Sequence, residues 1–89
     1  MKGQGVKTTV YIPSHNYGKY LGDAIESVLR QTFDRWELII IDDNSDDNTN
    51  EVMNLYKGDD RIRLFRTPGV GLAAIGNLAL KEAKGEYIM

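Results

Sequence analysis

Short runs of β-forming residues alternate along this chain with segments whose apolar residues recur at helical spacing. In the first helical segment, for example, Leu21, Ile25 and Leu29 fall on one stripe. Alternation of this kind is typical of β-α-β units and a parallel sheet, so the chain is predicted to be α/β. Strands are expected at 8–12, 36–41, 61–66 and 86–89, with helices between Gly18 and Gln31, from Ser45 to Gly58, and from Leu72 to Gly85.

The expected fold is a three-layer, Rossmann-like open parallel sheet. Right-handed crossovers through this element order give the strand order 3-2-1-4. Pro13 should stop the first strand, and Ser45 is the expected N-cap of the second helix. The alternating run 61–66 is typical of an outer strand with one wet face. Loops 13–18 and 42–45 should meet at the carboxyl ends of the strands, where open sheets bind ligands.

Size and composition limit the number of domains, the kinds of partner and the location that the chain can have. The 89 residues make one domain, 1–89, and the net charge of −2 with scattered Lys and Arg disfavours nucleic-acid binding. The longest apolar run, 38–41, is too short to cross a bilayer, and residues 1–5 lack the apolar stretch of a signal peptide. A cytoplasmic location is therefore expected.

The acidic pair Asp42-Asp43 carries the chemistry that the sequence suggests. Its carboxylates can accept hydrogen bonds from a base N–H and from ribose hydroxyls. They cannot hold phosphates, which need helix N-terminal amides, a cationic side chain or a metal on further carboxylates. Glu82 and Glu86 follow in ordinary helical and strand positions, so no metal site is expected in this chain.

Four ordered segments of the sequence resemble those of family-2 glycosyltransferases. They are Ile-Pro-Ser-His-Asn-Tyr at 12–17, Ala-Ile-Glu-Ser-Val-Leu-Arg-Gln-Thr at 24–32, the strand and Asp-Asp-Asn-Ser loop at 36–45, and Ala-Lys-Gly-Glu-Tyr-Ile at 83–88. The resemblance implies a GT-A fold and transfer of a sugar from a nucleotide-sugar donor, usually uridine-linked. It also implies a divalent metal, Mg or Mn, on the diphosphate of the complete enzyme.

Carried over by position, the resemblance also implies roles for individual residues. Asp43 corresponds to the carboxylate that accepts from the base, and Asp42 to its neighbour near the ribose. His15 stands where relatives often place a Tyr that packs on the uracil. The expected nucleotide-binding residues are thus Pro13, Ser14, His15, Asn16, Asp42 and Asp43.

The sequence also departs from the family pattern. Many relatives carry Arg or Lys where Gly76 and Ala74 stand here. The Asp-x-Asp motif, which binds the metal and follows the last strand in the family, is not in the chain, nor is a catalytic base. We therefore expect a truncated GT-A half-domain that is inactive alone and belongs to a parent enzyme, which is cytoplasmic or membrane-associated. The cut strand 86–89 predicts a homodimer through that segment.

Other interpretations stay open at this level. The Asp-Asp pair also fits a plain helix-capping turn with no role in ligand binding. In that case the chain would serve only in self-association or in binding a protein partner. Residues 69–74 match the dinucleotide fingerprint G-x-G-x-x-[G/A], although they follow the outer strand rather than a buried first strand.

Overall fold

The computed structural model describes residues 6–31, 35–85 and 87–88 and shows one parallel four-stranded sheet. The strand order is β3-β2-β1-β4, which confirms the predicted topology. The elements are β1 (Thr8–Ser14), α1 (Gly18–Leu29), β2 (Trp36–Asp43), α2 (Thr49–Asn54), β3 (Ile62–Thr67), α3 (Leu72–Glu82) and β4 (Tyr87–Ile88).

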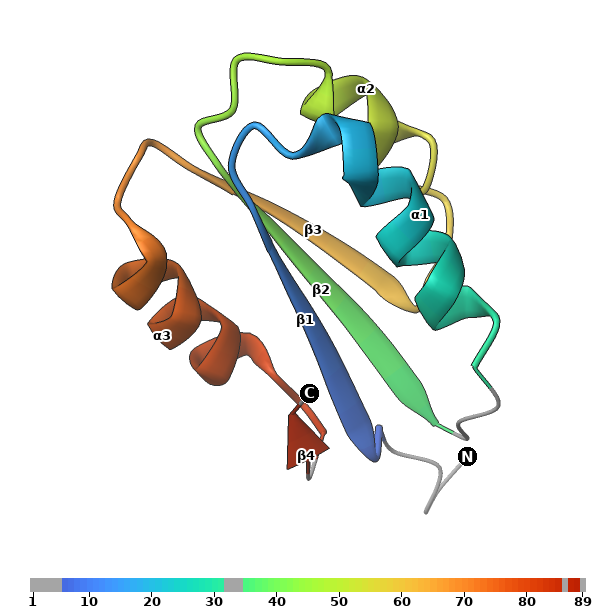
Figure 1. The fold of residues 1–89 in the computed structure, drawn as a ribbon. Helices are drawn as coiled ribbons and strands as arrows, with labels where there is room; N and C mark the ends of the chain where they lie inside the picture. The colour runs from blue at the N-terminus through green and yellow to red at the C-terminus, as the bar shows by residue number, and fades with distance from the viewer. Residues whose placement is uncertain (1–5, 32–34, 86, 89) are drawn as a thin grey trace.

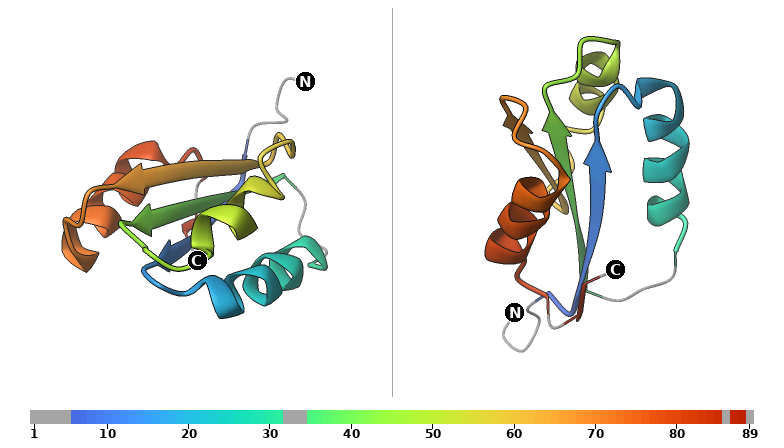
Figure 2. Two further views of the ribbon diagram at one scale, coloured as in Figure 1. Left: turned by 90° about the horizontal axis from the view of Figure 1, so that it is seen from above. Right: turned by 60° about the vertical axis from the view of Figure 1, so that its left-hand side comes forward.

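The helices cover both faces of the sheet, with α1 and α2 on one side and α3 on the other (Figures 1 and 2). Leu21 of α1 and Met53 of α2 belong to one buried cluster, together with Leu38 and Ile40 of β2. The second cluster joins Ile39 and Ile41 of β2 to Ile75 and Ala79 of α3. The three layers of the sequence prediction are therefore present.

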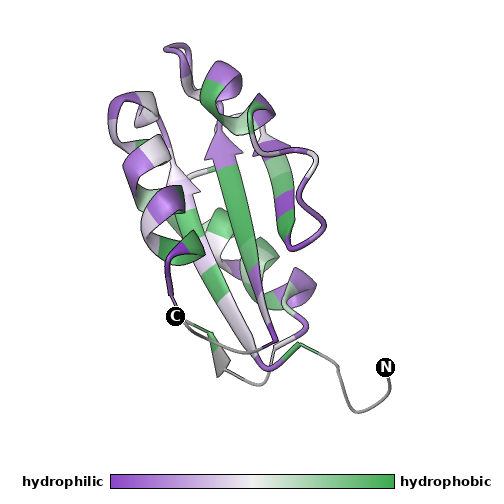
Figure 3. Cartoon of the chain, turned by 90° about the vertical axis from the view of Figure 1, so that its right-hand side faces the viewer, coloured by the Kyte–Doolittle hydropathy of each residue, from purple (hydrophilic) through white to green (hydrophobic). Residues whose placement is uncertain are grey.

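Strand β2 is the centre of the molecule, because every one of its residues is buried. Its side chains alternate between the two clusters, as the period of a strand requires. In Figure 3 the strand is hydrophobic along most of its length and hydrophilic at its tip. That tip is Asp42 and Asp43, so two acids leave the core at the carboxyl end of the strand.

The prediction that Pro13 ends the first strand was wrong by two residues. β1 runs to Ser14, and Pro13 pairs with Ile41 of β2. Within the described residues β4 pairs only with Thr8 and Thr9, so Pro13 lies where β1 has a neighbour on one side alone. Near the end of such a strand the missing N–H of proline is tolerated.

Ser45 does not cap the second helix, which begins only at Thr49. Its hydroxyl instead bonds the carboxylate of Asp42. The helix start is served by Asp47, which accepts from the Thr49 amide (3.0 Å) and from the Gly18 amide (3.0 Å). Asp47 thereby joins the first turns of α1 and α2, and its pKa is lowered mainly by the hydroxyl of Thr49.

The face of β3 that was expected to be wet is partly buried, because Arg63 folds toward β2 and the end of α3. Arg63 reaches the buried Glu37 (Nη1 to Oε1, 3.3 Å) and the Glu82 carboxylate (Nη2 to Oε1, 2.7 Å). Glu37 Oε2 also accepts from the hydroxyl of Thr9 (2.7 Å) and the amide of Lys84 (2.8 Å). Burial raises the pKa of Glu37, but these bonds outweigh it and leave the pKa below its usual value. The end of α3 is thus anchored to β1, β2 and β3.

The last strand is short, with Tyr87 and Ile88 alone described and Ile88 exposed. Glu86 and Met89, on which the homodimer prediction also depends, lie outside the described residues, and that prediction stays a prediction. In the part of the chain that the structure describes, no helix has the length and apolar character needed to cross a membrane.

Replacing Gly85 by Ala should destabilise the fold. The added Cβ would lie 2.6 Å from the amide nitrogen of Thr9 and 2.7 Å from its hydroxyl, so the backbone must shift. We expect a loss of about 1–3 kcal/mol in the free energy of unfolding, the usual cost of overpacking. Urea denaturation of the 89-residue chain measures it.

Gly76→Ala is the matched control, because a Cβ at Gly76 meets nothing within 4 Å and the residue lies inside α3. Alanine there should raise stability by roughly 0.5–1 kcal/mol through helix propensity. Equal effects of the two substitutions would show that the contact at Gly85 is not tight.

Candidate nucleotide-binding site

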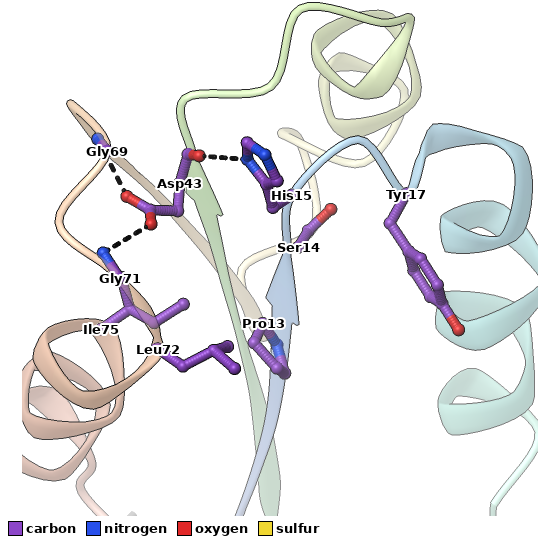
Figure 4. A pocket seen from close by; sticks show the side chains of 9 residues that line it. All are labelled: Pro13, Ser14, His15, Tyr17, Asp43, Gly69, Gly71, Leu72 and Ile75. Atoms are coloured by element: carbon purple, nitrogen blue, oxygen red, sulfur yellow. Dashed lines mark hydrogen bonds between the residues drawn. The ribbon is translucent and has the colours of Figure 1, made fainter.

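A pocket of about 570 Å³ opens at the carboxyl ends of β1 and β2, on the side of the sheet that α3 covers. The loop after β1 and the turn between β3 and α3 form its walls (Figure 4). Its lining is mostly apolar around the carboxylate of Asp43. The lining residues are Pro13, Ser14, His15, Tyr17, Asp43, Gly69, Gly71, Leu72 and Ile75.

The carboxylate of Asp43 is held by the turn between β3 and α3. Oδ1 accepts from the Thr67 hydroxyl (2.7 Å) and from the amides of Gly69 (3.0 Å) and Val70 (2.8 Å). Oδ2 accepts from the amide of Gly71 (2.8 Å). Successive amides that converge on one anion form a nest, and here the anion is part of the protein.

These donors favour the charged form of Asp43. The hydroxyl of Thr67, followed by the amides of Val70 and Gly71, lowers the pKa of Asp43 to about 2, although burial opposes the shift. The pocket therefore contains a fixed negative charge at neutral pH. A ligand group that faces it should donate a hydrogen bond rather than carry phosphate.

His15 is fixed by the backbone of the same aspartate. Its Nδ1 lies 2.7 Å from the main-chain oxygen of Asp43, which can only accept, so Nδ1 carries the hydrogen. The ring is exposed and stands beside the pocket (Figure 4). His15, in the loop after β1, and Asp43, at the end of β2, thus come together although they are 28 residues apart in the sequence.

Asp42 lies on the opposite face of the sheet from the pocket. Its side chain is fully buried, where it accepts from the Ser45 hydroxyl and lies 3.8 Å from Nε of Arg66. Adjacent residues of a strand point to opposite faces, so Asp42 does not line the pocket that Asp43 faces. Its place near the ribose stays a prediction.

Asn16 joins the two loops instead of lining the pocket. Its amide donates to the Ser45 hydroxyl (2.7 Å), and its side-chain oxygen accepts from the amide of Asp46 (2.8 Å). The residue has a left-handed φ of 54°, which asparagine tolerates better than most residues. Of the predicted site residues, Pro13, Ser14, His15 and Asp43 line the pocket, and the hydroxyl of Ser14 points away from Asp43 (Figure 4).

The described residues do not make a metal centre. No group of three His, Cys, Asp or Glu side chains within them is placed to hold an ion. Asp43 is already bound by the turn, and Asp42 is buried against Ser45. The carboxylates of this part of the chain therefore do not fit the divalent metal that the family resemblance implies.

Sequence reasoning missed the turn that holds Asp43. Gly69 and Gly71 have φ values of 90° and 92°, which glycine adopts readily, and this explains the G-x-G pattern at 69–71. The three amides that a dinucleotide phosphate would need from this turn are occupied by Asp43. The hypothesis of a dinucleotide-binding loop at 69–74 therefore loses its support.

The open parallel sheet, with helices on both faces and a pocket beside β1 where the strand order reverses, defines an α/β domain of the doubly wound type. A sequence profile described as "Glycosyl transferase family 2" matches residues 9–89. The chain belongs to this family, as its sequence motifs predicted.

Curated relatives agree with the family. An uncharacterized glycosyltransferase of Rickettsia felis is 45% identical over 82 residues, which are 92% of this chain and 14% of the relative. Glycosyltransferase GlyG of Streptococcus pneumoniae is 39% identical over 90% of this chain and 27% of its own length. Chondroitin synthase of Pasteurella multocida is 41% identical over 90% of this chain and 8% of its own length. The chain thus spans well under half of each of these relatives.

Solved structures match the fold. TarS of S. aureus in complex with UDP-GlcNAc aligns with a TM-score of 0.85 and 27% identity, over 94% of this chain and 25% of that one. The mannosyltransferase PcManGT of Pyrobaculum calidifontis, in complex with GDP-Man and Mn²⁺, aligns with a TM-score of 0.85 and 22% identity, over 94% and 26%. Both support the GT-A fold for the described residues.

Asp43→Asn should lower stability in a manner that depends on pH. A carboxylate whose pKa is depressed to about 2 adds stability above its ordinary pKa of about 3.9, and this is lost as pH falls through about 2. The wild-type chain should therefore exceed the variant in stability at about pH 6, and the gap should narrow toward about pH 2. Denaturation midpoints across this range test it.

Asp60→Asn removes the same charge from an exposed position and controls for the change in net charge. A gap between wild type and Asp43→Asn that stays constant with pH would contradict the assignment of the anchoring bonds to the charged carboxylate.

Proposed function

We propose that the chain is the nucleotide-binding part of a glycosyltransferase that takes its sugar from a nucleoside diphosphate donor, with uridine as the nucleoside. The observation that carries the proposal is the pocket itself, in which the Asp43 carboxylate faces apolar walls that include Pro13 and Leu72. A flat heterocycle that donates one N–H suits such a pocket.

The electrostatics of the pocket support a base rather than a phosphate. The residues that line it include no Lys or Arg, and the amides of 69–71 are occupied. A diphosphate placed against Asp43 would meet like charge. The phosphates and sugar of the donor therefore extend away from Asp43, toward groups other than the residues that line this pocket.

Similarity to TarS supports uridine as the nucleoside, because that protein was solved with UDP-GlcNAc and with UDP at 27% identity. His15, fixed beside the pocket by its bond to Asp43, presents a planar ring on which a base can stack. We further propose that a divalent metal serves the complete enzyme through carboxylates other than Asp42 and Asp43. The chain alone is then inactive in transfer.

Uridine diphosphate should bind the 89-residue chain, and Asp43→Ala should weaken the binding by on the order of tenfold or more, the worth of one hydrogen bond to a charged group. The variant loses both the acceptor and the anchor of the turn at 67–71. Isothermal titration calorimetry measures the dissociation constants, and circular dichroism checks that the variant folds.

Asp59→Ala is the control, because the described hydrogen bonds of the Asp59 side chain go only to Arg61, just before β3 and away from the pocket. It should leave the affinity unchanged. A similar loss in both variants would indicate nonspecific binding and would count against the proposed site.

A further inference from the structure

The turn of residues 67–71 treats the two oxygens of Asp43 unequally. Among the described residues, Oδ1 accepts three hydrogen bonds, from the hydroxyl of Thr67 and from two amides, whereas Oδ2 accepts only the amide of Gly71. A carboxylate offers about four acceptor positions, two on each oxygen. Oδ1 is therefore saturated, and one position on Oδ2 is left for a ligand.

The geometry places this open position toward the pocket. In Figure 4 the oxygen bonded to Gly71 is the one on the side of Leu72 and Pro13, whereas the other oxygen faces the turn at Gly69. Thr67 is the last residue of β3 and pairs in register with Asp43 of β2, so its hydroxyl reaches Oδ1 from a position that the sheet fixes. The rotation of the carboxylate is fixed before any ligand arrives.

We propose that Thr67 is a positioning residue that determines base specificity, because it holds Oδ1 in the turn and leaves Asp43 with a single open acceptor. This inference rests on the proposed function. Thr67 acts through Asp43 and does not line the pocket. The nucleotide is then selected by how many hydrogen-bond donors its base presents to one acceptor.

The edges of uracil, guanine and cytosine differ in this respect. Uracil presents one ring N–H between two carbonyl oxygens, which matches a single acceptor. Guanine presents a ring N–H beside an amino group, a pair that needs both carboxylate oxygens, so one donor stays unpaired and affinity falls on the order of tenfold. Cytosine presents an amino group beside a ring nitrogen without hydrogen, so a bond from the amino group to Oδ2 brings the lone pair of that nitrogen close to the carboxylate, acceptor against acceptor. The expected ranking is uridine, then guanosine, then cytidine.

Thr67→Val and Thr67→Ser test the role of the hydroxyl. Valine keeps the β-branched shape but removes the one donor that ties Oδ1 to β3. The carboxylate is then held by the amides of 69–71 alone and gains freedom to rotate together with them. The ratio of dissociation constants for guanosine and uridine diphosphates should fall on the order of fivefold, within the worth of one hydrogen bond. Serine restores the donor and should restore the ratio. Because the diphosphate is common to both ligands, the ratio reports on the base alone.

Asp43→Asn gives a second test, the relative affinity for cytidine and uridine diphosphates. A purely structural role of Asp43 would leave this relative affinity unchanged. The three donors at the Oδ1 position require an acceptor, so the amide oxygen should lie there and the amide nitrogen should take the place of Oδ2, at the cost of the Gly71 bond. The open position then donates instead of accepting. Cytidine diphosphate should bind this variant more tightly than uridine diphosphate.

Hydrogen exchange at the amides of residues 69–71 reads the same turn without any nucleotide. Exchange should quicken in Thr67→Val and return to the wild-type rate in Thr67→Ser. If exchange and the guanosine-to-uridine ratio are both unchanged in Thr67→Val, Thr67 does not position Asp43 and the inference is overturned.

The nucleotide titrations separate this inference from the proposed function. A wild-type chain that binds none of the three diphosphates overturns both together. If uridine diphosphate binds, but the three diphosphates have the same order of affinity in wild type, Thr67→Val and Asp43→Asn, this inference alone is overturned. The proposed function then stands.

Discussion

The alternation of side chains along β2 governs the rest of the structure. Because β2 is buried on both faces, its polar residues must find partners inside the protein where the strand leaves the core. Strand geometry sends Asp42 toward α1 and α2, and Asp43 toward α3. The two adjacent acids therefore stabilise different loops. Asp42 holds the loop before α2 through Ser45, and Asp43 holds the turn before α3.

Helix α3 depends on β2 at both of its ends. Its own burial is thin, with Ile75 and Ala79 as its buried residues. At its start the amides of 69–71 bind Asp43, and just past its end the amide of Lys84 binds Glu37. Two carboxylates of one strand thus set the helix in place, and the helix in turn forms a wall of the pocket. Loss of either carboxylate should therefore change the shape of the pocket as well as lower the stability of the fold.

Much of the fold could be predicted because it follows from patterns within single segments. Apolar periodicity gave the helices, and the near-continuous apolar run gave the central strand with the acids at its end. Right-handed crossovers then fixed the order of the strands. The motif at 12–17 led to Pro13, Ser14 and His15, which line the pocket.

The features that were missed depend on contacts between segments. Strand alternation alone could have shown that Asp42 and Asp43 point to opposite faces, since Leu38 and Ile40 lie in one core cluster and Asp42 continues their face. The role of Asn16 as a link between loops depends on Ser45, 29 residues away. Nothing local in the sequence shows that an aspartate will occupy the amides at 69–71.

The occupied turn changes how the glycines in this chain should be interpreted. A glycine-rich turn before a helix often serves to bind the phosphates of a nucleotide, because its amides point outward and the helix dipole favours an anion. Here the same amides point at Asp43, so the favourable site for an anion is already filled by the protein. A nucleotide would therefore not place its phosphates at this turn, as it usually does at a glycine-rich turn before a helix. The negative charge is fixed in the pocket wall, so a ligand group that faces it must donate a hydrogen bond, as a base N–H or a ribose hydroxyl does.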